Sequence, residues 1–521
     1  MMTAAVSTAP QRDPPRAVHA ALELGRPGVA PVKEHPHHER SFLLPAGFSS
    51  HPDLQLPPTM GLPVATVNSE AVDLDASSSI KPEEKSPVHR LTALRSSTSP
   101  APEHDYLVGV RGCLVILSFL WVFLSVFAPT AVKDTDVTNG PYYQTILRKV
   151  LSVLFWNQSL IYSSIVLLSA RTICVPFLKN PTRQVVASQL FRRGIRLWIP
   201  TTVSFGMAAL ILNQIGTAYI DDFRTRTGHT NVATPEDLPN FLNFFNSLFE
   251  IFWVVHDFAK QKASLAYPSQ TLWIVSLVFL QSYTVYMSMI CIPYTRNSWR
   301  VKAFVLYILT AWWVQSWAWY SATGLLLADV VINMDFKAKS RRGVKVTVPY
   351  VGSWRCPTWP IAAVIALAGF IMEYLWVAWR PSFANAEIRA HTGLYTTGGL
   401  NDGADLTQPQ ARDDNYLIIV AFMLMLETYE VVQNIFKQPV FMYLGRRSFS
   451  YFLVQSIIIY TAGIKLFLHL RHEKNWPTGA SNILCLLVSL VTVIPGAEIF
   501  YRVVDLPAQV IAQLAWNFII E

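Results

Sequence analysis

Charged residues are scarce in this sequence, at 15% of 521 residues, whereas an average soluble domain has about 25%. A chain with so few charges lacks the polar surface that a soluble protein of this length needs. Hydrophobic residues make up 52% of the sequence, and the mean hydropathy is +0.30. We infer that most of the chain is surrounded by lipid.

Cysteines are also few, and no two form a C-x-x-C pair, so the sequence predicts neither a disulfide framework nor a zinc site. The five are Cys113, Cys174, Cys291, Cys356 and Cys485. Residues 1–16 lack the apolar core of a secretory signal peptide, so the first apolar run is expected to act as an internal signal.

Tryptophan is absent from residues 1–104, which hold 15 of the 33 prolines. A segment of this composition cannot bury enough apolar surface to offset the entropy lost on ordering. We therefore expect a disordered cytosolic tail, which either only tethers the chain or carries phosphorylation sites. The remaining sequence divides into a membrane domain over 105–507 and a short C-terminal tail over 508–521.

Ten apolar runs follow the tail, and a helix of about 20 apolar residues crosses a bilayer. They lie at 107–129, 150–170, 197–216, 272–293, 302–319, 321–334, 359–379, 416–435, 449–468 and 481–501. The sixth is short and fits either a tilted or a re-entrant segment. The sequence thus predicts an all-α integral membrane protein, a bundle of about ten transmembrane helices.

Lysine and arginine gather in the short loops that follow the second, fourth, sixth and eighth runs. With ten crossings these loops share one side, which is cytosolic by the positive-inside rule. The loop 380–415 on the other side has more acids than bases. We expect both termini in the cytosol and an endomembrane or plasma-membrane location. The net charge of +8 therefore reflects topology and predicts no nucleic-acid partner.

Several sequence blocks in the membrane domain resemble, in order and spacing, those of the acyltransferase 3 family, most of all its fungal-type branch. They are Tyr106–Gly112, Phe191–Pro200, Leu272–Phe279, Gly324–Asp329, Tyr443–Gln455 and Tyr501–Pro507. The resemblance covers about residues 106–507 and identifies the chain as a divergent member of these multi-span membrane O-acyltransferases. It implies a helical membrane bundle that transfers an acyl group, such as acetyl, from acyl-CoA to a hydroxyl.

The chain departs from the family at polar positions and keeps the apolar scaffold. Val122 stands where the family has the histidine that is taken as its general base, and Val278 and Val108 replace its Glu and Asp. Gln455 replaces a second histidine, and Ser164-Ile165 replaces a Ser-Gly pair. Because valine cannot accept a proton, any activity needs a substitute base, which typically contributes about 10²–10⁴-fold in rate.

The resemblance also implies that arginines at the cytosolic side hold the phosphates of acyl-CoA. Arg111, Arg192, Arg193 and Arg196 are the candidates, since a guanidinium binds phosphate through a planar fork. Positive-inside anchoring of helix ends would place the same residues there. Both interpretations stay open.

His256 and Asp257 are weak candidates for a substitute base, because they are adjacent, but an interfacial histidine is the simpler interpretation. Four acids lie within the apolar runs, where a charge is costly unless it is paired or functional. They are Asp329, Glu373, Glu427 and Glu430. The last two are three residues apart and are expected on one helix face. They predict either a proton or substrate path or ion pairs with arginines of neighbouring helices.

Two classes of function follow. One is an enzyme that acylates a membrane lipid, a glycan or a small-molecule secondary metabolite, with acyl-CoA as co-substrate and no bound cofactor or metal. The other is a catalytically lapsed relative that acts as a transporter, scaffold or sensor, in which Val122, Val278 and Val108 mark the loss of the family's polar residues.

Overall fold

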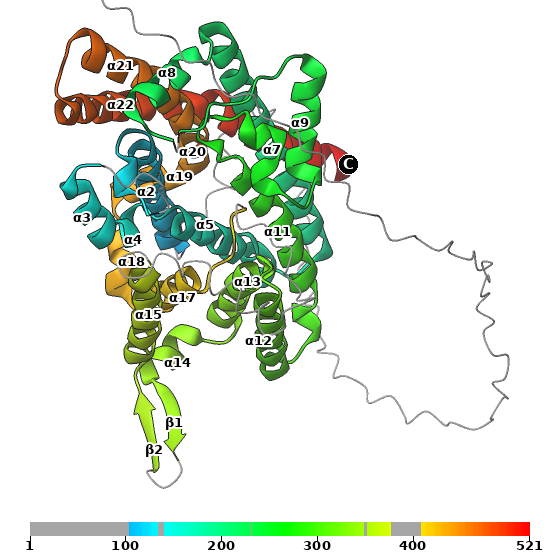
Figure 1. The fold of residues 1–521 in the computed structure, drawn as a ribbon. Coiled ribbons are helices and arrows are strands. Elements are labelled where there is room, and N and C mark those ends of the chain that lie inside the picture. Colours follow the sequence, from blue (N-terminus) through cyan, green and yellow to red (C-terminus); the bar gives the residue numbers. More distant parts are fainter. Residues whose placement is uncertain (1–103, 134–139, 231, 349–351, 377–407, 521) are drawn as a thin grey trace, which may run out of the picture. The chain divides into compact units, whose positions relative to one another are not determined.

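The computed structural model describes residues 104–133, 140–230, 232–348, 352–376 and 408–520. Residues 1–103 of the expected disordered tail and residues 380–407 of the expected outer loop lie outside this part of the chain. Helices make up most of the described residues (Figure 1), in agreement with the expected helical class.

Helices of very different length follow one another along the chain. In its first half they are α2 (Asp105–Phe127), α3 (Tyr142–Val150), α4 (Ser152–Phe155), α5 (Gln158–Ile173), α6 (Val175–Lys179), α7 (Arg183–Ile215), α8 (Ala218–Thr227), α9 (Phe241–Trp253) and α10 (Lys262–Leu265). In its second half they are α11 (Trp273–Ile290), α12 (Asn297–Trp313), α13 (Ala318–Asn333), α14 (Phe336–Arg342), α15 (Thr358–Tyr374), α17 (Asp413–Thr428), α18 (Glu430–Phe436), α19 (Pro439–Arg446), α20 (Ser448–Ile458), α21 (Ile464–Leu468), α22 (Thr478–Phe500) and α23 (Leu506–Ile520). Short 3-10 or π turns are η2 (Pro129–Ala131), η3 (Phe258–Lys260), η4 (Pro268–Gln270), η5 (Ile292–Tyr294), η8 (Ile459–Gly463), η9 (His469–Glu473) and η10 (Tyr501–Asp505).

Among the described residues, 6 helical stretches are long and apolar enough to cross a membrane, or 7 if the bent pair α17–α18 is one span. The six are Asp105–Phe127, Ser152–Lys179, Arg183–Ile215, Pro268–Tyr294, Ser448–Glu473 and Thr478–Ile520. Each contains or overlaps an apolar run of the sequence, so these stretches fit the expected membrane protein. The runs at 302–319, 321–334 and 359–379 correspond to the shorter helices α12, α13 and α15.

A β-hairpin is the exception to the helical class. Strands β1 (Val344–Val348) and β2 (Gly352–Cys356) pair antiparallel, with Val344 opposite Cys356. The hairpin lies between α14 and α15, within the basic loop that follows the sixth apolar run (Figure 1).

Two of the long helices, α5 and α7, begin at polar caps. The Asn157 side chain accepts a hydrogen bond from the Leu160 amide at the start of α5, and Thr182 accepts one from the Val185 amide at the start of α7. Such caps satisfy amides that have no partner within the helix. Helix α7 ends at Gly216, whose φ of 74° is readily adopted only by glycine.

Glycines let α2 approach α19, and α13 approach α5, with their backbones in contact. A Cβ at Gly445 of α19 would overlap the Val108 carbonyl of α2, and a Cβ at Gly112 of α2 would overlap the Phe441 carbonyl of α19. A Cβ at Gly324 of α13 would lie 2.6 Å from the Leu167 carbonyl of α5. Small residues allow such close packing in membranes, where van der Waals contact drives helix association.

The end of the chain is helical rather than an extended tail. Residues 506–520, which include most of the expected C-terminal tail, form α23. This helix lies along α7, where the Phe191 and Trp516 rings are 6.0 Å apart. Helix α7 therefore packs against the C-terminal helix over the segment that carries its arginines.

Candidate functional site

Arg111 and Arg193 reach the same end of α5 from two different helices. The Arg111 guanidinium of α2 donates a hydrogen bond to the Thr172 hydroxyl. The Arg193 guanidinium of α7 donates to the Ser169 hydroxyl at 2.9 Å and to the Val278 carbonyl of α11 at 3.3 Å. Since Ser169 and Thr172 lie three residues apart on α5, they share one helix face. The structure thus brings these two candidates together.

Arg192 and Arg196 lie on the same segment of α7. Arg192 donates one hydrogen bond to the Gln513 side chain of α23 and another, at 3.3 Å, to the Ser188 carbonyl. Arg196 is exposed and interacts electrostatically with Asp505, without an ion pair among the described residues. Asp505 instead accepts hydrogen bonds from Ser450 and Gln509 at 3.2 Å each.

None of the four arginines forms an ion pair with a carboxylate within the described parts of the chain. Their only hydrogen bonds there are to hydroxyl, amide and carbonyl groups. By contrast, Arg171, Arg300 and Arg447, which also lie on apolar helices or at their ends, each contact a carboxylate. A buried charge is costly unless it is compensated. We call Arg111, Arg192, Arg193 and Arg196 the arginine cluster. Within the described bundle no ion pair compensates its positive charge, so it is a candidate binding site for an anion.

A narrow crevice lies beside the arginine cluster. It is a partly open gap of about 160 Å³ between α5, α11 and α13. Its lining includes Ser169 and Val278, the two residues that Arg193 contacts, together with Gln281 and Ser321. The space has no room for a water-sized molecule, so in this structure it is a gap between packed helices and not a ligand pocket.

The position of the family's base is apolar in this structure. Val122 of α2 is completely buried in the main hydrophobic core. One helical turn earlier, Ser118 accepts a hydrogen bond from the Gln455 amide of α20 at 2.8 Å. The Gln455 carbonyl oxygen and the Tyr162 hydroxyl lie buried without a hydrogen-bond partner in the described chain. None of these three side chains, Ser118, Gln455 and Tyr162, accepts a proton at neutral pH.

His256 and Asp257 lie apart from the arginine cluster. The two side chains contact each other, with Nδ1 of His256 3.2 Å from Oδ2 of Asp257, and both are well exposed at 74% and 59%. They follow α9 and precede η3. A pair exposed in this way is not positioned by a protein pocket, and the structure does not bring it next to Val122, which is buried.

The acids of the apolar helices are paired with basic residues, as one of the two interpretations predicted. Glu427 accepts hydrogen bonds from Nε of Arg171 at 2.9 Å and from the Tyr106 hydroxyl at 2.5 Å. Asp329 contacts Arg300 at 2.6 Å. These pairs join α17 to α5 and α13 to α12, so they act as structural ties between helices.

Glu427 and Glu430 do not share a helix face, and that expectation was wrong. Helix α17 ends at Thr428 and α18 begins at Glu430 with a bend of 103°. The intervening Tyr429 has extended backbone angles, φ −110° and ψ 122°. As a result Glu430 has other partners than Glu427, and it contacts Lys337 at 2.8 Å and Arg341 at 3.0 Å.

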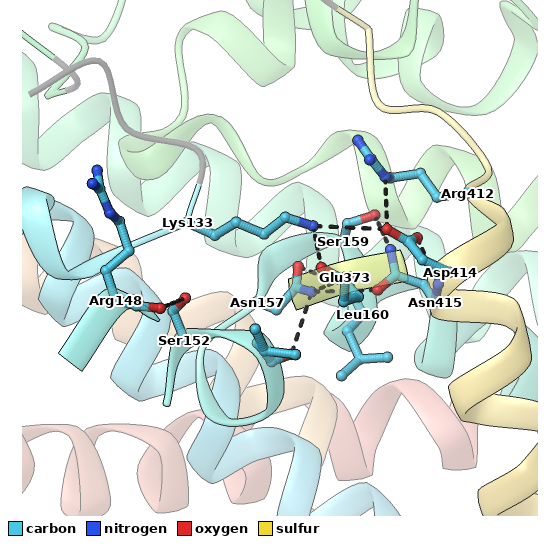
Figure 2. Close-up of polar contacts among 11 residues, drawn as sticks. Lys133, Arg148, Ser152, Asn157, Ser159, Leu160, Glu373, Arg412, Asp414 and Asn415 are labelled. Atoms are coloured by element: carbon cyan, nitrogen blue, oxygen red, sulfur yellow. Dashed lines mark hydrogen bonds and ion pairs between the residues drawn. The ribbon is translucent and has the colours of Figure 1, made fainter. Parts of the chain in front are cut away.

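Figure 2 shows a second group of buried charges, of which only Glu373 was singled out in the sequence. Nζ of Lys133 lies 2.6 Å from Glu373 of α15 and 4.0 Å from Asp414 of α17. Nε of Arg412 lies 3.5 Å from the same Asp414 carboxylate. The Glu373 and Asp414 side chains are both fully buried. Two cations thus balance two carboxylates.

Amide side chains extend this network to α5. Asn157 donates to Glu373 at 2.9 Å and to the Asn415 side chain at 3.3 Å, and Asn415 donates to Ser159 at 2.9 Å (Figure 2). The network ties the segment after α2 to α5, α15 and α17. Glu373 could be found in the sequence as an intramembrane acid, but Lys133 and Asp414 lie at the ends of apolar runs, where charges are ordinary. Their pairing is a property of the packing.

No metal-binding cluster of three or more histidine, cysteine or acidic side chains occurs among the described residues. The chain matches no family model, no curated protein and no solved structure.

Proposed function

We propose that this chain is a membrane-embedded acyltransferase-like protein that binds acyl-CoA through the arginine cluster and transfers the acyl group to a hydroxyl of a lipid, glycan or secondary metabolite. The observation that carries the proposal is the absence, within the described residues, of carboxylate partners for Arg111, Arg192, Arg193 and Arg196. The phosphates of CoA supply the missing negative charge. The resemblance to the acyltransferase 3 family supports the same donor.

The proposal includes ten membrane crossings with both termini in the cytosol. Helices α12, α13 and α15 supply the crossings beyond the six long stretches and the bent pair α17–α18. In this topology α2 begins, and α5 ends, at the cytosolic face, where acyl-CoA is available. The arginine cluster then lies at the end of the bundle that the donor reaches.

The resemblance to the acyltransferase 3 family favours a short acyl group, such as acetyl. In the transfer, the acceptor oxygen forms a bond to the acyl carbon while the carbon–sulfur bond breaks, and CoA leaves as the thiol with the proton of the acceptor. Arg193 holds the donor with its phosphates toward the cytosolic end, which positions the acyl carbon for attack. Within the described chain no side chain near Val122 supplies a general base.

A catalytically lapsed relative, a transporter, scaffold or sensor that keeps the donor site, is the second candidate. It is favoured by one observation, the complete burial of Val122 in the apolar core. An apolar residue at that depth neither accepts a proton nor recruits water to do so. Binding of acyl-CoA without turnover would distinguish this candidate from the enzyme.

Replacing Arg193 and Arg196 together by alanine is expected to weaken binding of acetyl-CoA at least about 100-fold, because each charge-assisted hydrogen bond is worth about 1.5–3 kcal/mol. The measurement is calorimetric titration of acetyl-CoA into the detergent-purified protein. Arg226→Ala is the matched control, since Arg226 is an exposed arginine of α8 that is paired with Asp222 at 2.6 Å. Absence of binding by the unmodified protein would refute the donor site and both candidate functions.

Restoring the family's polar residues tests whether catalysis has lapsed. The double variant Val122→His with Val278→Glu is expected to raise acyl-CoA hydrolysis or transfer by about 10²–10⁴-fold if only the base is missing. Release of free CoA thiol is the readout, and Val122→Asn with Val278→Gln is the control for size and polarity without a base. Equal rates in the two double variants would count against a base-deficient acyltransferase site.

A further inference from the structure

An apolar groove runs along the bundle away from the α5 contact of the arginine cluster. It has a volume of about 570 Å³ and is lined by α2, α19, α20 and α22. The lining includes Val115, Phe119, Val440, Leu490 and Ile494. The Val440 side chain on its edge is 62% exposed, so the groove opens outward on apolar surface that a bilayer would cover.

A cluster of charges lies at one end of this groove. Tyr443, which lines the groove, donates a hydrogen bond to Glu498 at 2.9 Å. Glu498 also accepts hydrogen bonds from Arg447 and from Nε of Arg502, the latter at 2.7 Å. The Arg447 guanidinium stacks on the Tyr443 ring, 3.8 Å from its centroid. A single hydroxyl thus connects the apolar groove to the charged cluster.

The charged end is basic overall and open to solvent. Arg447 and Arg502 both contact Glu498, and within the described chain no other carboxylate forms an ion pair with either of them. The Arg502 side chain is 72% exposed, and its only hydrogen bond in the described chain uses Nε. Its two terminal nitrogens therefore remain available to an anion. Arg446 is likewise exposed.

We propose that this groove is a binding site for an anionic glycerophospholipid, with one acyl chain in the groove and the negatively charged headgroup against Arg502. The lipid tails of the bilayer are as apolar as the groove, so burial alone gives no preference for one lipid. Selectivity comes from the headgroup, because each Lys or Arg near the membrane surface adds an attraction for anionic lipid. The site is separate from the donor site and does not depend on the proposed acyl transfer.

The orientation of the groove suits such a lipid. Its apolar lining extends from Tyr443, beside the charged cluster, to Leu490 and Phe119 deeper along α22 and α2. Helix α22 runs from Thr478 to Phe500, so Glu498 and Arg502 lie at the end of the bundle where α2 begins. A lipid tail that enters the bilayer from that surface would follow the same direction.

Native mass spectrometry of the full-length protein, stripped of lipid in detergent and then mixed with phosphatidylserine or phosphatidylcholine, tests the site. We expect one phosphatidylserine per chain to be retained. Filling the groove with Val440→Trp and Leu490→Trp should lower that retention at least 10-fold, whereas Val364→Trp with Leu367→Trp, at exposed positions of α15, should leave it unchanged. Equal retention by the two double variants would show that the groove does not bind the acyl chain of the lipid.

A second variant tests the headgroup contact without touching the apolar lining. Arg502→Gln is expected to reduce the preference for phosphatidylserine over phosphatidylcholine by about 5-fold, the effect of one surface arginine. Arg226→Gln, a change at an exposed arginine of α8, should not alter the preference. If the unmodified protein retains both lipids equally, or if Arg502→Gln leaves the preference intact, the assignment of the anionic headgroup to Arg502 is wrong.

Discussion

Replacing Glu427 by leucine is expected to lower the stability of the folded protein by about 3–5 kcal/mol, because the variant leaves Arg171 as an uncompensated buried charge. Both side chains of the pair are almost completely buried, at 0% and 1% exposure. The Tyr106 hydroxyl would lose its acceptor at the same time. The midpoint of thermal unfolding in a single detergent measures the effect.

Two controls separate this effect from a general loss of packing. The double variant Arg171→Met with Glu427→Leu removes both charges and should recover most of the lost stability, since apolar replacements of a buried pair are often neutral. Glu430→Leu removes an exposed acid only three residues away, and an exposed ion pair is worth about 0–1 kcal/mol. A Glu427→Leu protein as stable as Glu430→Leu would show that the pair is not a structural tie.

Alanine at Gly445 or Gly112 is expected to destabilise the protein by about 1–3 kcal/mol or more, because the added methyl group meets a backbone carbonyl that cannot move aside. The Val108 carbonyl lies over Gly445, and the Phe441 carbonyl lies over Gly112. The two helices would have to separate along their contact. The same thermal midpoint reports the change.

Gly194 provides the matched control. It also lies within a helix, α7, but in the described structure nothing is within 4 Å of the position of an added Cβ. Alanine there should be neutral or should stabilise by about 0.5–1 kcal/mol, as expected for glycine within a helix. If all three alanine variants unfold at the same midpoint, then the contact between α2 and α19 contributes little.

The positions of the long helices could be predicted from the apolar runs of the sequence. Hydropathy alone located the six long helical stretches because a span must be continuously apolar. The glycines of the Tyr106–Gly112 and Tyr443–Gln455 blocks, noted only as part of a resemblance, turn out to meet each other between α2 and α19. The arginine candidates were found in the same way, and the structure groups Arg111 with Arg193 through α5.

Other features depend on tertiary contacts that no local pattern reports. The bend at Tyr429 falls inside the apolar run 416–435. Hydropathy does not depend on backbone angles, so it could not predict this bend. The network of Lys133, Glu373 and Asp414 joins residues that are more than 200 positions apart. Glu373 stood out as an acid within an apolar run, but Lys133 and Asp414 looked ordinary, and only packing shows that the three charges compensate one another.

The glycine contacts also restrict which helices can shift relative to one another. Wherever two main chains touch directly, as between α2 and α19, α5 and α13, or α15 and α17 at Gly369, no side chain can change rotamer to admit a displacement. Helix α7 has no such contact at its two interior glycines, because the nearest atoms to Gly206 belong to the Phe244 side chain at 3.7 Å or more. The helix that carries three of the arginines is thus packed through a side chain at Gly206, and not through the direct backbone contact that fixes α2 against α19.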